Sequence, residues 1–581
     1  MGFDRTTALD RLATDEFDVV VVGGGITGVG CALDAVSRGL RTALVERGDF
    51  ASGTSSRSSK LVHGGVRYLE QKEFGLVREA LAERQIALGN APHLVHVMPF
   101  LIPIMKKDGL INRRLARALG GVLWMYDLSG GFRIKKLHKR VKRDDAIARV
   151  PTLRPDRLAS GYLYYDATAD DARLTLAIAR TAADLGATIV NHASAVDVLK
   201  TPAGRAAGVR VDADGHTIDV RARVVVNAGG VWADAVRALD EGAHPATMRP
   251  AKGVHITVPW RRVRNEIAMF VPVPSDGRAV FVVPWGDVTY IGTTDDDYTG
   301  DIDDPQCTAD DVAYLLAAVN HALVDPLTEA DVIGTWAGLR PLLAAATKAK
   351  TADLSRRHGI RVSGAGVVTV TGGKLTTYRA MARDTIDQVG QVLDGVHRRC
   401  RTKTLPIHGA AGYRPLAVGA AALDVHLAER YGTEATAITA LIAADPTLAE
   451  SLVPGLPYVK AEAVFAVRAE MARTLDDVLD RRTRCRILDR AATADAAESV
   501  ARLLAPEWGW DDATVTAAVA AYRADLAAER DAASAPVSVS GPASRPTDRA
   551  CAPDPRRPRH APDADTSGAA CEPPLGARST P

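Results

Sequence analysis

The chain has 581 residues, of which 47% are hydrophobic and 24% are charged, and its formal net charge is +2. This length exceeds what one hydrophobic core organises, so we expect two or three domains with room for an enclosed cofactor. The near-neutral charge excludes a general nucleic-acid-binding function, and the sequence predicts no nucleic-acid partner.

The six cysteines are scattered, with no CxxC pair and no His/Cys cluster at the spacing of metal ligands. We therefore predict no disulfide framework, no metal and a reducing, cytoplasmic compartment. The N-terminal segment MGFDRTTALDRLATDEFD is polar and lacks the apolar core of a signal peptide. No apolar run reaches the roughly 18 to 20 residues that span a bilayer, so we expect any membrane contact to be peripheral.

The first predicted element is a strand over residues 17–22 (FDVVVV), an apolar run typical of a central parallel strand. It leads into GGGITG, which has G-x-G-x-x-G spacing. Gly23 permits the tight turn, Gly25 lets the backbone approach a pyrophosphate, and Gly28 lets the next helix pack closely on the strand. We expect that helix over residues 29–38, with its N-terminal N–H groups aimed at phosphates.

A second predicted strand, residues 41–46 (RTALVE), ends the unit on Glu46. A carboxylate about 20 residues after the glycines accepts hydrogen bonds from ribose hydroxyls, and it argues against the 2′-phosphate of NADP. This cradle alone admits NAD as well as FAD, because both present the same adenosine geometry.

Three later segments favour FAD. Residues 51–68 (ASGTSSRSSKLVHGGVRY) offer donors that can follow the pyrophosphate towards an isoalloxazine ring, although alone they are also compatible with an ordinary polar loop. Residues 223–232 (RVVVNAGGVW) end a buried strand in a small-residue turn, and residues 367–379 (VVTVTGGKLTTYR) return to the same sheet. So late a return implies a discontinuous cofactor domain with an inserted substrate domain, a layout typical of flavoproteins.

The composition changes towards the C-terminus. Strand-like and helix-like segments alternate over the first 380 residues, which favours an α/β fold. From about Asp424 to Ala528 the chain is rich in Ala, Leu, Glu and Arg with helical spacing, so we expect a separate helical domain. Beyond about Asp531 large apolar residues almost vanish, which predicts a disordered tail.

Seven motifs occur together along residues 17–381: GGGITGVGCALDAVSRGL, SGTSSRSSKLVHGGVRYLE, YYDATADDARL, KGVHITVP, IGTTD, GLRPLL and GGKLTTYR. In combination they resemble the family of aerobic, FAD-dependent glycerol-3-phosphate dehydrogenases. Residues 470–484 (EMARTLDDVLDRRTR) are similar to that family's C-terminal signature.

The resemblance implies that sn-glycerol 3-phosphate is oxidised to dihydroxyacetone phosphate, with hydride transfer from C2 to flavin N5 and electrons passed to a quinone or, in oxidase members, to oxygen. It implies a glutathione-reductase-like FAD-binding fold that is discontinuous, with an inserted mixed α/β substrate domain and a C-terminal helical domain. The expected boundaries are 1–16 for an N-terminal extension, 17–90, 160–240 and 335–385 for the FAD-binding domain, 91–159 and 241–334 for the substrate domain, 400–530 for the helical domain, and 531–581 for the tail.

Oxidising a secondary alcohol requires a base for the hydroxyl proton and cations that hold the phosphate. His63 and His255 are the predicted catalytic histidines, and the sequence leaves open which is the base. Arg340 is predicted to be both catalytic and substrate-binding, because Pro341 restricts the backbone before it.

The phosphate is expected to contact Arg67, Arg340 and Lys374, with Tyr68 beside them. Each cation is also compatible with a solvated surface position, but glycine-rich turns after apolar strands favour a site. The predicted cofactor-binding residues are Gly23, Gly24, Gly25, Thr27, Gly28, Glu46, Thr54, Ser55, Ser58, Ser59, Lys60, Leu61, His63, Ala228, Gly229, Trp232, Gly373, Lys374, Leu375 and Thr376.

Two polar clusters are interpreted as structural elements rather than as catalytic residues. Residues 293–295 (TTD) follow a strand end and are interpreted as an element that shapes the site, or as an ordinary turn. Asp170, Asp171 and Arg173 begin a helix and are interpreted as capping residues with a salt bridge.

Residues 135–143 (KKLHKRVKR), with Arg113, Arg114 and Arg117 before them, interleave basic and apolar side chains. One hypothesis is that they lie on anionic lipid at the inner face of the cell membrane, and a solvated loop is the alternative. A homodimer is a further hypothesis.

Two other functions stay open at this point. One is a related FAD oxidoreductase or oxidase that acts on another small hydroxy or amino acid, for which a single arginine suffices. The other is a flavoprotein without catalytic activity that serves as a binding module.

Overall fold

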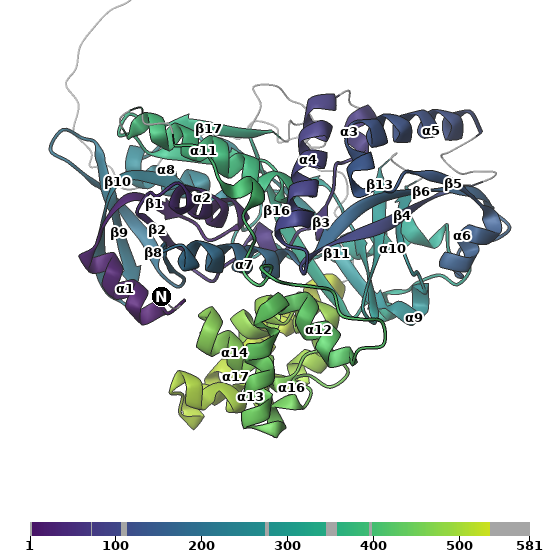
Figure 1. Cartoon of the computed structure of the whole chain (residues 1–581). Coiled ribbons are helices and arrows are strands. Elements are labelled where there is room, and N and C mark those ends of the chain that lie inside the picture. The colour runs from purple at the N-terminus through teal and green to yellow at the C-terminus, as the bar shows by residue number, and fades with distance from the viewer. Residues whose placement is uncertain are drawn as a thin grey trace, which may run out of the picture. The chain divides into compact units, whose positions relative to one another are not determined.

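The computed structural model describes residues 3–70, 73–105, 113–273, 278–343, 357–393, 395 and 398–534 (Figure 1). Within these ranges the side chains of Arg67, Glu70 and residues 113–118 are not described. The expected tail therefore lies outside the described residues from position 535 onward, and the last helix continues to Ser534. No helix in the described part is long and apolar enough to cross a membrane.

The first sheet contains the predicted cradle and has the strand order β17-β18-β10-β1-β2-β7, with β9 pairing both β10 and β8. Strands β18, β10, β1, β2 and β7 are parallel, as expected for a cofactor-binding sheet. The strands are β1 (Glu16–Val22), β2 (Thr42–Val45), β7 (Thr188–Val190), β8 (Ser194–Lys200), β9 (Ala206–Ala213), β10 (His216–Asn227), β17 (His358–Val362) and β18 (Val368–Gly372).

Helices α2 (Ile26–Ser37) and α11 (Tyr378–Val392) lie side by side against this sheet, and α7 (Asp171–Asp184) packs next to α2 (Figure 1). Their apolar faces share one core with β1 and β18. The late return of residues 367–379 to the cradle is therefore confirmed. Helix α2 begins three residues before the predicted position, because it starts directly after Gly25.

The second sheet has the order β15-β11-β14-β13-β12-β4-β6-β3, with β16 pairing β11 and β5 pairing β6. Its pairs are antiparallel except β4 with β12. The strands are β3 (Leu61–Val62), β4 (Val95–Met105), β5 (Lys139–Lys142), β6 (Leu158–Ala169), β11 (Met248–Pro259), β12 (Ala268–Pro272), β13 (Ala279–Trp285), β14 (Val288–Gly292), β15 (Asp296–Asp297) and β16 (Gly334–Leu343).

Two strands of the second sheet begin close to expected domain boundaries. Strands β6 and β16 were expected in the FAD-binding domain from residues 160 and 335, and both belong to the second sheet. The reason is that β16 pairs with β11 along ten residues, a long-range register that composition does not reveal. The remaining helices of this part are α1 (Arg5–Thr14), α3 (Arg67–Glu70), α4 (Phe74–Asn90), α5 (Arg113–Leu128), α6 (Arg143–Arg149), α8 (Ala233–Glu241), α9 (Trp260–Val263) and α10 (Ala309–Asn320).

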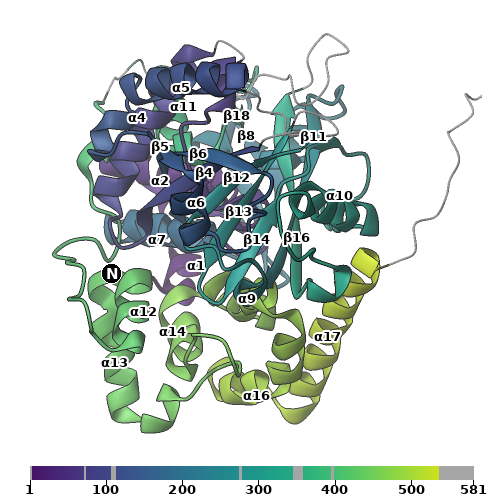
Figure 2. The same ribbon diagram turned by 90° about the vertical axis from the view of Figure 1, so that its right-hand side faces the viewer.

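The C-terminal region is helical, as predicted, and α16 and α17 run side by side in Figure 2. Its helices are α12 (Ala422–Tyr431), α13 (Ala435–Ala444), α14 (Lys460–Glu470), a π-helix (Asp477–Arg482), α15 (Cys485–Leu488), α16 (Arg490–Trp508) and α17 (Asp512–Ser534). Helix α14 ends at Met471, whose backbone is left-handed with φ +56°.

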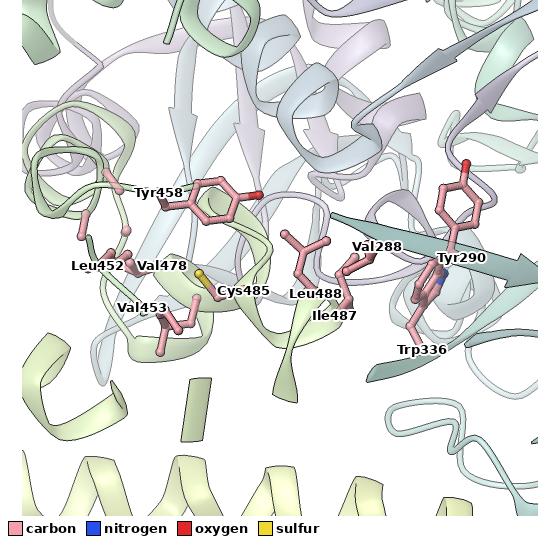
Figure 3. Packing of buried hydrophobic residues seen from close by; sticks show 14 of the residues in the cluster. Val288, Tyr290, Trp336, Leu452, Val453, Tyr458, Val478, Cys485, Ile487 and Leu488 are labelled. Atoms are coloured by element: carbon pink, nitrogen blue, oxygen red, sulfur yellow. The ribbon is translucent and has the colours of Figure 1, made fainter. Parts of the chain in front are cut away.

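This helical region does not have a hydrophobic core of its own. Ile487 and Leu488 belong to the same buried cluster as Tyr290 and Trp336 of the second sheet (Figure 3). Residues 1–536 accordingly form one compact unit. The expected boundary near residue 400 therefore separates two kinds of secondary structure but not two cores.

Candidate functional site

The turn between β1 and α2 has the geometry of a phosphate cradle. Gly23 has φ +115°, and a Cβ atom there would lie 2.6 Å from the carbonyl oxygen of Ala228. A Cβ atom on Gly28 would lie 1.8 Å from the carbonyl oxygen of Gly23. Gly25 caps α2 without a side chain, and the N–H of Ile26, the first residue of the helix, donates to the hydroxyl of Ser55. The residues present therefore fit a dinucleotide pyrophosphate at this helix N-terminus.

Two backbone hydrogen bonds fix the orientation of Glu46, the residue predicted to bind a ribose. Its Oε2 accepts a hydrogen bond from the N–H of Gly24 at 2.6 Å, and its Oε1 accepts one from Gly48 at 2.8 Å. Burial raises the pKa of Glu46, while these two hydrogen bonds oppose that rise. The remaining lone pairs of the carboxylate are in position to accept hydrogen bonds from hydroxyl groups.

A cavity of about 410 Å³ connects the cradle with the predicted substrate residues. It is lined by every predicted cofactor-binding residue except Gly24, Gly28 and Lys60, and by Tyr68, His255 and Arg340. This volume lies within the range of about 300 to 1,000 Å³ that is common for ligand sites. Residues more than 300 positions apart in the sequence therefore line the same cavity.

The three exceptions have structural roles. Gly24 donates its N–H to Glu46, and Gly28 packs against Gly23. Lys60 is 1% exposed, donates to Asp171 at 2.9 Å, and lies with its Nζ 4.8 Å from the centre of the Trp336 ring. Its burial lowers the pKa of Lys60 to about 8. Lys60 stays a predicted cofactor-binding residue, and its ammonium group is directed to Asp171.

His255 is a rigidly held, neutral imidazole. Its ring stacks on Trp336 with centres 4.7 Å apart, and Nε2 lies 2.8 Å from the hydroxyl of Ser59. Nδ1 is buried and has no hydrogen-bond partner among the described residues. Burial lowers the pKa of His255 well below its usual value, and the charges of Lys60 and Arg340 lower it further. The ring is therefore neutral at neutral pH.

Arg340 is fixed by the segment that the sequence predicted to shape the site. Its guanidinium donates to Asp295 at 2.9 Å and to the hydroxyl of Thr293 at 3.1 Å. A Cβ atom on Gly253 would lie 2.5 Å from that guanidinium, so glycine leaves space for it. Arg340 is thus a cation at the cavity with a defined orientation.

Lys374 and Tyr68 meet on another wall of the cavity. The Nζ atom of Lys374 lies 3.6 Å from the centre of the Tyr68 ring. His63 also lines the cavity, with its ring set edge-on against Phe281 at 6.0 Å. The side chain of Arg67 lies outside the described residues, so its predicted role stays a prediction.

Three cations that line the cavity were not predicted from the sequence: Arg47, Arg57 and Arg278. Arg57 and Arg278 both line the cavity, and Arg278 donates to the carbonyl oxygen of Asp295 at 3.3 Å. Arg57 lies within the donor-rich stretch of residues 51–68, but its spacing does not distinguish it from its neighbours. Arg278 has no sequence signal, because it enters the site only through the start of β13.

Comparison with known proteins gives consistent matches. Residues 18–385 match the family model described as FAD dependent oxidoreductase, and residues 400–515 match the C-terminal domain of alpha-glycerophosphate oxidase. A protein of Mycobacterium tuberculosis (strain ATCC 25618 / H37Rv) named glycerol-3-phosphate dehydrogenase 2 is 42% identical over 549 residues, 92% of each chain. The human mitochondrial glycerol-3-phosphate dehydrogenase is 37% identical over 527 residues, which cover 86% of this chain and 71% of the human one.

A solved structure supports the same fold. The glycerol-3-phosphate dehydrogenase from Bacillus halodurans, solved in complex with FAD, aligns with a TM-score of 0.71 and 32% identity. The alignment covers 90% of this chain and 97% of that one.

Proposed function

Because the chain belongs to the FAD dependent oxidoreductase family, and within it to the glycerol-3-phosphate dehydrogenases, we propose that it oxidises sn-glycerol 3-phosphate to dihydroxyacetone phosphate. The resemblance, the fold class and the FAD cofactor predicted from the sequence motifs are confirmed. When bound, FAD supplies at N5 the acceptor for the hydride that leaves C2 of the substrate.

The observation that carries the proposal is the shared cavity. The cradle residues at one part of its lining fit an adenosine diphosphate group, and Arg340 and Lys374 at another part fit a dianionic phosphate. A carboxylate substrate would need a single arginine, so two cations at one cavity favour a phosphorylated alcohol over a hydroxy or amino acid.

The substrate groups have proposed partners among the described residues. Arg340, held by Asp295 and Thr293, binds the phosphate in a fixed orientation. Lys374 adds a compact positive charge beside Tyr68. Because binding energy spent on the phosphate orients C2, these cations also contribute to the rate.

His255 is the proposed acceptor of the hydroxyl proton. Its imidazole is neutral at physiological pH, because burial and nearby cations lower its pKa. Stacking on Trp336 and the contact with Ser59 prevent it from turning away during the reaction. His63 is proposed to hydrogen-bond the substrate from the opposing wall, next to Phe281.

An anaerobic reduction experiment tests the function. The yellow protein is mixed with sn-glycerol 3-phosphate without oxygen, and its flavin absorbance is expected to bleach. Glycerol, which lacks the phosphate, is the control and is expected to leave the absorbance unchanged. A protein that binds FAD but is bleached by no polyol phosphate contradicts the proposal. Reoxidation by a quinone analogue or by oxygen then identifies the electron acceptor, which we propose to be a quinone.

A peripheral membrane contact would suit a quinone acceptor. Large apolar side chains are exposed on α5 and after it, with Trp124 at 53% and Phe132 at 53% exposure. Exposed Lys135, Lys136 and Lys139 lie next to them in the chain. This combination of apolar and basic side chains fits the inner face of a membrane with anionic lipid. The cytoplasmic side and the homodimer stay predictions.

A further inference from the structure

The C-terminal region contacts the loop that follows the cradle. Arg482 donates to both carboxylate oxygens of Asp49, at 2.7 Å and 2.9 Å, and Arg481 donates to one of them at 2.7 Å. The side chains of Asp49 and Arg482 are almost completely buried. A buried bidentate ion pair therefore joins two segments that lie 433 positions apart.

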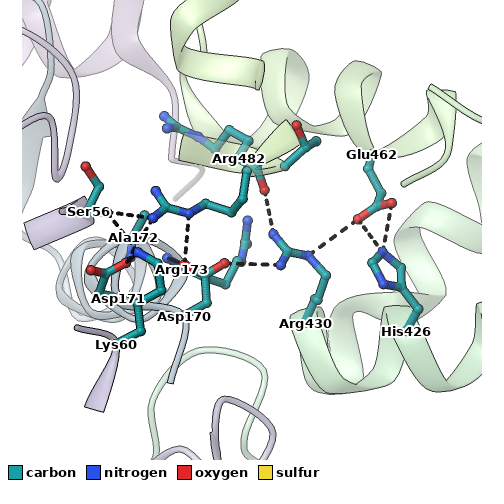
Figure 4. A network of polar contacts seen from close by, with 12 residues as sticks. Ser56, Lys60, Asp170, Asp171, Ala172, Arg173, His426, Arg430, Glu462 and Arg482 are labelled. Atoms are coloured by element: carbon teal, nitrogen blue, oxygen red, sulfur yellow. Dashed lines mark hydrogen bonds and ion pairs between the residues drawn. The ribbon is translucent and has the colours of Figure 1, made fainter. Parts of the chain in front are cut away.

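Arg484 forms a second anchor a few residues further along this loop. Its guanidinium donates to the carbonyl oxygen of Ser56 at 2.6 Å and to Asp171 at 3.2 Å. The same carboxylate accepts hydrogen bonds from Lys60 at 2.9 Å and from the hydroxyl of Ser58 at 2.7 Å. Figure 4 shows this group, with Ser56, Lys60 and Asp171 connected by dashed lines.

Residues 52–55 and 57–59 of this loop line the cavity. The hydroxyl of Ser55 accepts a hydrogen bond from the N–H of Ile26, the first residue of α2, at 2.8 Å. The hydroxyl of Ser59 lies 2.8 Å from His255. Holding Asp49 at one end of the loop and Ser56 to Lys60 at the other therefore fixes the hydroxyl groups that line the site.

The acidic cluster around Asp49 does not fit a metal site. Asp49, His192 and Asp477 bring their ligand atoms within 4.8 Å of one another. However, both oxygens of Asp49 accept hydrogen bonds from arginine, and one oxygen of Asp477 accepts one from Arg481. Guanidinium groups already neutralise these carboxylates and would repel a metal ion.

We propose that Arg481, Arg482 and Arg484 are positioning residues that clamp residues 49–60 against the cofactor, so that the C-terminal region retains FAD. This inference rests on the proposed function, because it takes the cavity to be an FAD site. The hydrogen bonds of these arginines reach Asp49, Ser56 and Asp171, and their effect on the cavity is transmitted through Ser55, Ser58 and Ser59.

The affinity of the full-length protein for FAD tests the clamp. FAD is removed from Arg484→Gln and from the native protein, and each apoprotein is titrated with FAD while flavin fluorescence is followed. Loss of two buried hydrogen bonds from a charged donor is expected to raise the Kd for FAD by about tenfold or more. Arg484→Lys keeps a donor near Ser56 and is expected to recover most of the affinity.

Arg180→Gln is the matched control. Arg180 lies on α7, its side chain is 7% exposed, and its described ion pairs are with Glu434 and Glu470 of the C-terminal region rather than with the loop. Its loss is expected to lower the Tm to a similar extent while the Kd for FAD stays within about twofold of native. The proposal is overturned if both variants raise the Kd equally, or if Arg484→Gln leaves it unchanged.

Failure of the proposed function has a different signature. A native protein that binds FAD tightly but is not bleached by glycerol 3-phosphate overturns the assigned reaction and leaves the clamp intact. A native protein with no affinity for FAD overturns both.

Discussion

The hydroxyl of Ser59 lies 2.8 Å from Nε2 of His255, although the two residues are 196 positions apart. Ser59 belongs to the loop held by Asp171 and Arg484, and His255 belongs to β11 of the second sheet. This contact therefore joins the cofactor loop to the proposed proton acceptor.

Ser59→Ala is expected to lower kcat for glycerol 3-phosphate by about fivefold, because it removes one hydrogen bond of about 1 kcal/mol that orients His255. The KM is expected to change little, since Arg340 and Lys374 are untouched. Steady-state kinetics measure both values. Ser59→Thr keeps the hydroxyl and is the control; equal losses in both variants would show that the contact is not the cause.

Lys374→Met is expected to raise the KM for glycerol 3-phosphate about 10- to 100-fold, because a charged hydrogen bond to phosphate contributes about 1.5 to 3 kcal/mol. Steady-state kinetics with varied substrate test this. Lys460→Met is the matched control, since Lys460 pairs with Glu450 and does not line the cavity. An unchanged KM in Lys374→Met would contradict the assigned role.

Gly25→Ala is expected to weaken FAD binding by about tenfold or more while the protein stays folded. The added Cβ atom would lie 3.1 Å from the hydroxyl of Ser55, a side chain that has to shift by a few tenths of an ångström, and it would occupy the approach of the pyrophosphate. Fluorescence titration and thermal unfolding measure the two effects. Gly121→Ala, where a Cβ atom meets nothing within 4 Å, is expected to leave both values at native levels.

Glu470 makes the protein sensitive to acid. The charges of Arg173 and Arg180 outweigh the burial of Glu470 and lower its pKa from 4.5 to about 2. Because the native pKa lies below the unfolded one, this stabilisation is present above pH 4.5 and is lost as the pH falls towards 2. Its size is on the order of 3 kcal/mol at neutral pH.

Urea unfolding across this pH range measures the effect in the native protein and in Glu470→Gln. The variant is expected to be less stable at pH 7, by about 3 kcal/mol or more, and to lose less stability between about pH 4.5 and 2 than the native protein does. Glu507→Gln, which removes a surface pair with Arg468, is the control and is expected to follow the native curve. If the unfolding free energies of the native protein and Glu470→Gln depend on pH in the same way, Glu470 is not the source of the acid sensitivity.

Reversal of two exposed lysines tests the membrane contact. The double variant Lys136→Glu and Lys139→Glu is expected to reduce flotation with anionic vesicles at low salt by about tenfold or more, since each basic residue contributes about 1 kcal/mol. Lys403→Glu with Arg414→Glu makes the same charge change elsewhere on the exposed surface. A native protein that does not float, or equal losses in both variants, would count against the proposed surface.

Some of the site was predictable because its signals are local. Gly23 and Gly28 stand at positions where the backbone itself requires glycine, and a strand with four consecutive valines precedes them. Glu46 follows the next strand at a fixed distance along the chain. The motifs around Lys374 and Arg340 carried the family resemblance, which the comparisons then confirmed.

Other features depend on contacts between distant segments. The ammonium group of Lys60 is buried against Asp171, 111 positions away. The pairing of β16 with β11 places this strand in the second sheet. Neither outcome depends on the residues next to Lys60 or β16 in the sequence.

The amino-acid sequence alone therefore determined the cradle, the cofactor class and the family, because steric limits at glycine and the period of apolar residues act over a few positions. Only the tertiary structure decided that Ser59 meets His255, that Thr293 and Asp295 hold Arg340, and that Arg484 reaches Ser56. These contacts depend on sheet register and helix packing, which are set by the simultaneous burial of segments hundreds of residues apart.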